Sequence, residues 1–175
     1  MSNPADEVLL YFTKNITTDI LVALVANNLT LHKAHYVYDP VNLCFSVGFL
    51  GDADKKEVIQ LDIVVEKSIP FLRFGIIIYS DIPHSRIGAA VELVTRLNSQ
   101  VRMGAFKFDY ETQNCIFEYN IYPLDQPITD NVLVNQIEML LKNYYFVLDA
   151  FKSVILDDQK PLLVYHTLIK STNSN

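Results

Sequence analysis

An acid, a histidine and a serine lie close together in the segment DIPHS at 81–85. Such groups form a hydrolytic triad when the acid orients the histidine and the histidine deprotonates the serine. Here Asp81, His84 and Ser85 follow one another along a turn, and closeness along a turn does not provide triad geometry. Ser85 also suits the N-cap of a following helix, where its hydroxyl accepts a backbone N–H. We therefore expect a helix cap here and no catalytic residue.

Residues that could bind a metal are grouped only weakly. His32 and His35 fall at the entrance of a predicted strand, where a spacing of three places them on opposite faces. Asp52, Asp54 and Glu57 lie in a polar loop, for which a solvated acidic turn is favoured over a cation site. The sequence has no glycine-rich phosphate loop and no cysteine pair at zinc-ligand spacing. We predict neither a metal nor a cofactor.

The charge of the chain argues against nucleic acid as a partner. The formal net charge is −6 and the sequence pI is about 5.1. Phosphate contacts need clustered Lys and Arg. The arginines all fall in the middle of the chain and could line a basic strip, but solvated charges on separate faces are favoured: Arg73, Arg86, Arg96 and Arg102.

The two cysteines favour a reducing compartment. Cys44 and Cys115 lie in predicted strands far apart in the sequence, and the polar, acidic segment 1–7 does not resemble a signal peptide. No apolar run reaches the length that a membrane-spanning helix needs. We expect a cytoplasmic protein without membrane insertion.

Alternation of apolar residues predicts an antiparallel sheet. The segment 58–66 places Ile59, Leu61, Ile63 and Val65 on one face and polar residues on the other. Further strands are predicted at 33–38, 43–50, 71–79, 105–110 and 115–122. Short connections between alternating strands favour antiparallel pairing with one face covered.

Helical spacing predicts the elements that cover this sheet. One helix is expected at 18–28, with Thr18 as its cap, and a second helix is expected after Ser85. A third helix is expected from Thr129 to about 156, and its apolar stripe includes Val134, Ile137 and Leu141. The segments 8–12 and 161–170 stay open between helix and other states. No internal repeat is evident. The predicted fold is α+β, an antiparallel sheet with helices packed on one face, in the order α-ββββ-α-ββ-α.

The segment from 76 to 155 resembles the YbjN-like family of bacterial sensory transduction regulators. The residues that carry the resemblance are LVTRLN at 93–98, GAFKF at 104–108, the second hairpin strand, and the helix opened by ITD at 128–130. The resemblance implies a fold similar to that of type III secretion chaperones. The length of 175 residues predicts a single domain, placed at 1–160, followed by a C-terminal segment at 161–175 with a frayed end.

The resemblance implies a non-enzymatic protein that binds other proteins as a homodimer. Alternatives are a secretion-effector chaperone, and a small-ligand-binding protein or enzyme without a recognisable site. The strand at 71–79 has too many apolar residues on its outer face to be left in water. The candidate partner or dimer surface therefore comprises Cys44, Phe71, Ile77 and Tyr79.

Overall fold

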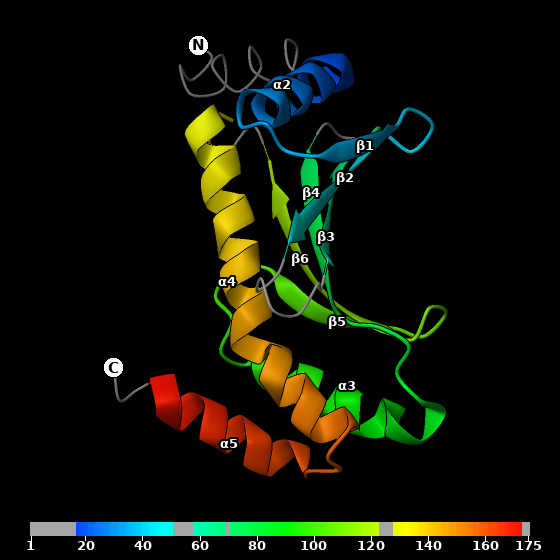
Figure 1. The fold of residues 1–175 in the computed structure, drawn as a ribbon, viewed down its shortest axis with the longest axis vertical. Coiled ribbons are helices and arrows are strands. Elements are labelled where there is room, and N and C mark those ends of the chain that lie inside the picture. The colour runs from blue at the N-terminus through cyan, green and yellow to red at the C-terminus, as the bar shows by residue number, and fades with distance from the viewer. Residues whose placement is uncertain (1–16, 51–57, 69–70, 123–127, 173–175) are drawn as a thin grey trace, which may run out of the picture. The chain divides into compact units, whose positions relative to one another are not determined.

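The protein has an α+β fold, as predicted, in a computed structural model that describes residues 17–50, 58–68, 71–122 and 128–172 (Figure 1). The predicted segment 8–12 and the acidic loop at 52–57 lie outside the described residues. In chain order the elements are α2 (Thr18–Leu31), β1 (Tyr36–Asp39), β2 (Cys44–Leu50), β3 (Val58–Val65), β4 (Leu72–Tyr79), the 3-10 helix η1 (His84–Arg86), α3 (Ile87–Asn98), β5 (Ala105–Asp109), β6 (Asn114–Ile121), α4 (Asp130–Ile155) and α5 (Pro161–Thr172).

The described strands form one six-stranded antiparallel sheet in the order β1-β2-β3-β4-β6-β5. The order of helices and strands along the chain matches the predicted α-ββββ-α-ββ-α. The segment 161–170, for which the sequence predicts no definite state, is helical as part of α5. Buried and partly exposed residues alternate along β3 and β4, so one face of the sheet is covered. The similarity to secretion chaperones stays a prediction.

The chain divides into two compact units. Unit 1 comprises Met1–Phe74 and Asn120–Ile137, and unit 2 comprises Gly75–Tyr119 and Glu138–Asn175. A single domain at 1–160 with a separate C-terminal segment stays a prediction from the sequence.

Unit 1 buries the strand face that the sequence predicts. Ile59, Leu61, Ile63 and Val65 are each at most 2% exposed, whereas Gln60 is exposed. On the side of these residues α2 packs against β3 and buries Leu21, Val25 and Leu29. The cap of α2 is Thr17, one residue before the predicted Thr18, since the Thr17 Oγ1 accepts a hydrogen bond from the Ile20 N–H at 3.4 Å.

In unit 2 the start of α3 differs from the prediction. Ser85 lies inside η1, and its hydroxyl caps neither η1 nor α3. The backbone instead tightens into a 3-10 turn, in which the Arg86 N–H donates to the Pro83 carbonyl at 2.7 Å. The prediction that Ser85 is an N-cap is therefore wrong, because the 3-10 turn takes the place of a side-chain cap.

The long helix α4 begins where predicted but buries a partly different stripe. Thr129 accepts a hydrogen bond from the Val132 N–H on its side-chain oxygen. The first buried residues are Leu133 and Leu140, whereas Val134 and Leu141 are half-buried. The sequence has apolar residues at both members of each adjacent pair, so periodicity alone cannot decide which member faces the core.

Candidate functional site

The residues that could do acid–base chemistry do not form a triad. The Asp81 N–H donates to Asn114 Oδ1 at 3.2 Å, and His84 Nε2 lies 3.0 Å from the Gln113 amide nitrogen. The Ser85 hydroxyl has no hydrogen-bond partner within the described part of the chain. His32 and His35 are exposed. Across the described ranges, no group of three or more His, Cys, Asp or Glu is placed to bind a metal ion.

Three of the four arginines have acidic partners. Arg73 Nε lies 3.0 Å from Glu66, Arg96 pairs with Glu92 on the same helix, and Arg86 pairs with Asp158. The Asp158 carboxylate accepts a hydrogen bond from Arg86, which lowers the pKa of Asp158. Among the described residues Arg102 has no hydrogen bond or ion pair. The arginines therefore do not form a strip of free positive charge.

The candidate surface residues of unit 1 lie in polar and aromatic surroundings. Cys44 lines an open hollow of about 640 Å³ together with Ser46, Glu66 and Arg73. Ser46 Oγ donates to Asp62 Oδ1 at 2.6 Å, and desolvation raises the pKa of the Cys44 thiol. Phe71 instead packs against the ring of Tyr122, with 4.9 Å between the ring centroids. In unit 1 the surface is therefore more polar around Cys44 than the sequence suggested.

The candidate residues of unit 2 share a face with a further apolar side chain. A Cβ added to Gly75 would lie 4.0 Å from Glu118 Cγ, which places these two positions side by side on one face of β4 and β6. Because side chains alternate along a strand, Ile77, Tyr79 and Ile116 lie on the same face. All three are half-buried. We call Ile77, Tyr79 and Ile116 the outer strip.

The surroundings of the outer strip combine apolar and charged groups. Lys107 is paired with Ile116 across β5 and β6, and its ammonium group forms an ion pair with Glu118. Partial burial raises the pKa of the Tyr79 phenol. The opposite side of the same strands is fully buried, with Ile76 and Phe117 at 0% exposure. The outer strip is thus the less covered side of the sheet in unit 2.

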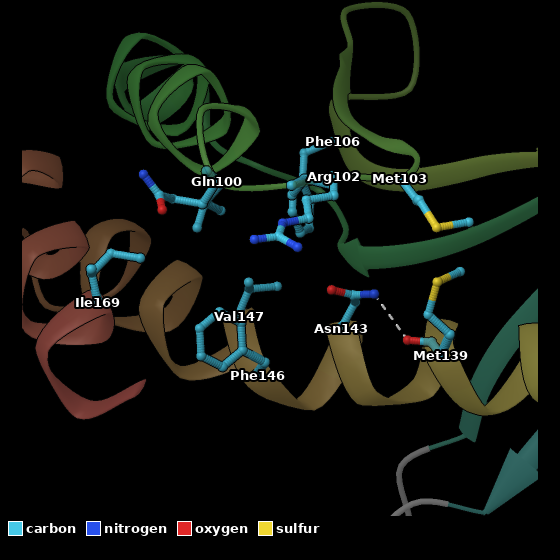
Figure 2. Close-up of a pocket in the computed structure, with 11 residues that line it drawn as sticks. Gln100, Arg102, Met103, Phe106, Met139, Asn143, Phe146, Val147 and Ile169 are labelled. Carbon is cyan, nitrogen blue, oxygen red and sulfur yellow. Dashed lines mark hydrogen bonds between the residues drawn. The ribbon is translucent and has the colours of Figure 1, made fainter. Parts of the chain in front are cut away.

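A pocket of about 320 Å³ opens elsewhere in unit 2, between helices and the start of β5 (Figure 2). Its walls are mainly apolar, and three polar side chains line it: Gln100 and Arg102 from the segment that follows α3, and Asn143 from α4. We call it the helix-side pocket. Sequence patterns indicate Arg102 only as a member of a basic strip, and no local pattern connects it with Asn143, because only folding brings the two segments together.

No family model matches this chain, and no curated protein matches it. The resemblance to YbjN-like proteins therefore stays a prediction. Over the described ranges, none of the helices combines the length and the apolar character needed to cross a membrane.

Proposed function

We propose that this protein is a non-enzymatic, cytoplasmic protein-binding domain of the YbjN-like family that acts as a homodimeric adaptor. The observation that supports this function is the outer strip on β4 and β6. The outer strip brings apolar side chains to the less covered side of the sheet: Ile77, Tyr79 and Ile116. Contact of apolar surface with water is unfavourable, so burial of this strip against a partner would lower the free energy.

A second copy of the same strip fits this surface. In a two-fold dimer the same patch meets itself, so an apolar centre contacts an apolar centre. The Lys107–Glu118 ion pair flanks the centre and offers both signs of charge to the same pair on the other copy. An apolar core with a charged rim is the usual composition of a protein interface.

The overall charge favours a protein partner. A chain with net charge −6 repels polyanions, and three of its arginines are already paired with acids. An adaptor could use the remaining apolar surface of unit 1 around Phe71 and Tyr122 for its partner.

Light scattering on the purified chain tests the dimer. We expect a mass of about twice 20.0 kDa for the wild type, and a monomer for Ile77→Asp, because a charge in the centre of the interface is costly. Leu163→Asp is the matched control, since Leu163 is 61% exposed on α5 and lies outside the outer strip. Circular dichroism must show that both variants are folded.

Two outcomes would refute the dimer through this face. One is a wild-type monomer at about 100 μM, a concentration at which weak micromolar dimers assemble. The other is a dimer that Ile77→Asp leaves intact. Affinity capture from the native host, with wild type and Leu163→Asp as bait, then tests the adaptor function. We expect both baits to retain one common protein, whereas capture of none would contradict the adaptor.

A further inference from the structure

We propose that the helix-side pocket binds a small monocarboxylic acid with a hydrocarbon tail. The pocket belongs to unit 2 and lies apart from the residues of the outer strip, so this inference does not depend on dimer formation. Its volume of about 320 Å³ falls at the lower end of the range for small-molecule sites.

The walls suit a flexible apolar tail. Phe106 and Val147 are buried at the base, while Met103 and Phe146 are 50% and 38% exposed at the opening. Met139 faces Met103 across the pocket (Figure 2). Thioether side chains adapt their shape to a ligand at little cost because they are unbranched and polarisable.

Arg102 is the group left to bind the head of a ligand. Gln100 is held by the Tyr165 hydroxyl, which lies 2.9 Å from its amide nitrogen, and Asn143 donates to the Met139 carbonyl at 3.0 Å. The guanidinium of Arg102 extends between these two side chains (Figure 2). It has neither hydrogen bond nor ion pair with any described residue. A planar guanidinium matches a carboxylate with two parallel hydrogen bonds.

The charge and volume of the pocket define the ligand class. Among the described residues that line the pocket, Arg102 is the one charged side chain, so it balances a single negative charge. A phosphate monoester carries about −1.5 to −2 at neutral pH and would remain under-neutralised. With about 30 Å³ for each water-sized group, the pocket holds roughly ten non-hydrogen atoms. Octanoate has this size and charge.

The methionines provide a direct readout of binding. The chain has three methionines, and two of them, Met103 and Met139, line the pocket. We would label the methionine methyl groups with ¹³C and titrate the full chain with octanoate. A ligand this small is expected to bind with a Kd of roughly micromolar to millimolar. We expect the signals of Met103 and Met139 to shift with saturation as octanoate is added.

Two arginine variants test the role of the charge. Arg102→Gln should weaken octanoate binding about tenfold, the usual effect of losing one hydrogen bond to a charged group. Arg96→Gln is the matched control, because it removes the same charge from an arginine on α3 that pairs with Glu92 and is absent from the pocket lining. Octanol supplies the same tail without the carboxylate and should bind more weakly than octanoate.

Each contrary result would overturn the proposal. These results are no shift of Met103 or Met139 up to about 10 mM octanoate, equal affinity for octanol, or equal affinity of the two arginine variants. Because Arg102 is exposed, its substitution is not expected to unfold the chain.

Discussion

Each unit contains a helix followed by a hairpin, and the two hairpins close in the same way. In unit 1 α2 precedes β1 and β2, and in unit 2 α3 precedes β5 and β6. Asp109 follows Asp39 by 70 residues, and each of them ends the first strand of its hairpin. The residue before the second strand, Leu43 or Gln113, has a positive φ of 51° or 56°. The chain therefore carries a structural repeat that its sequence does not show.

The two hairpin loops share their hydrogen bonds. Asp39 Oδ1 accepts from the N–H groups of the residues two and three positions later, at 2.8 and 3.3 Å. Asp109 does the same at 2.9 and 3.4 Å. The other carboxylate oxygen accepts from the side chain of Asn42 or Thr112 at 2.7 Å. An aspartate that holds its own loop in this way specifies a turn locally.

The links between helix and hairpin differ. In unit 1 the Lys33 N–H donates to the Thr30 carbonyl and the Ala34 N–H to the Leu29 carbonyl, which is a Schellman motif with a lysine where glycine is usual. In unit 2 Asn98 holds the edge strand, since its amide exchanges two hydrogen bonds with the backbone of Phe106. Local turn chemistry is therefore repeated between the two units, whereas each link between helix and hairpin follows the packing of its own unit.

The largest predicted effect is at Gly104. Its φ is +79°, and an added Cβ would lie 2.6 Å from the Glu118 carbonyl oxygen and 2.7 Å from Phe117 Cζ. We expect Gly104→Ala to lower the free energy of unfolding by about 2 kcal/mol or more in urea titrations. Ala34→Gly changes the corresponding position of unit 1 and should cost less than about 1 kcal/mol. Equal losses of stability in the two variants would contradict the expectation that only the link of unit 2 requires glycine.

A smaller loss is expected at the paired asparagines. Asn98→Ala removes two hydrogen bonds of 2.8 and 2.7 Å and should cost about 1–3 kcal/mol. Asn28 is the corresponding residue of unit 1 and donates to Asp130 at 3.3 and 3.4 Å. These longer bonds are weaker, so Asn28→Ala should cost less. A larger loss for Asn28→Ala in the same urea titration would contradict this ranking.

At Lys33 we expect a gain in stability. Its φ of 53° is unfavourable for a side chain with a Cβ, and glycine is free of that penalty. Lys33→Gly should raise the free energy of unfolding by about 0.5–1 kcal/mol, after the entropy that glycine adds to the unfolded chain. Lys33→Ala removes the same charge but keeps the Cβ, and it should show no such gain. A stability increase in both variants would assign the effect to charge.

The starts of α2 and α3 should differ in the stability that is lost when a hydroxyl is removed there, again by less than about 1 kcal/mol. Thr17→Ala removes the cap of α2 and should cost about 0.5–1 kcal/mol. Ser85→Ala removes a hydroxyl that caps no helix and should stay within about 0.5 kcal/mol of the wild type. Thermal melts of both variants test this difference, and a larger loss for Ser85→Ala would restore the role that the sequence suggested.

Sequence patterns predicted the strands better than the caps, the repeat and the pocket. Alternation fixes which side of β3 is buried, because one period describes the whole strand. The start of α3 was wrong because a cap and a 3-10 turn fit the same residues. The repeat is not visible in the sequence because the two hairpins share few identical residues beyond their loop aspartates. The helix-side pocket could not be predicted, since α3, α4 and α5 supply its lining from distant parts of the chain.

The loop aspartates give the smallest effect and the sharpest test of the repeat. Hydrogen bonds from Asn42 lower the pKa of Asp39, and those from Thr112 lower the pKa of Asp109, both from about 3.8. A carboxylate whose pKa is lower in the folded state stabilises the fold above its unfolded pKa, and this contribution is lost as the pH falls through the folded pKa.

We expect the melting temperature to fall below about pH 4, and less steeply in Asp39→Asn and in Asp109→Asn. Asp149→Asn, at an exposed position of α4, is the control for the loss of one negative charge outside the two loops. If one loop variant flattened the profile and the other did not, the two loops would not be equivalent, and the repeat would be one of chain path alone.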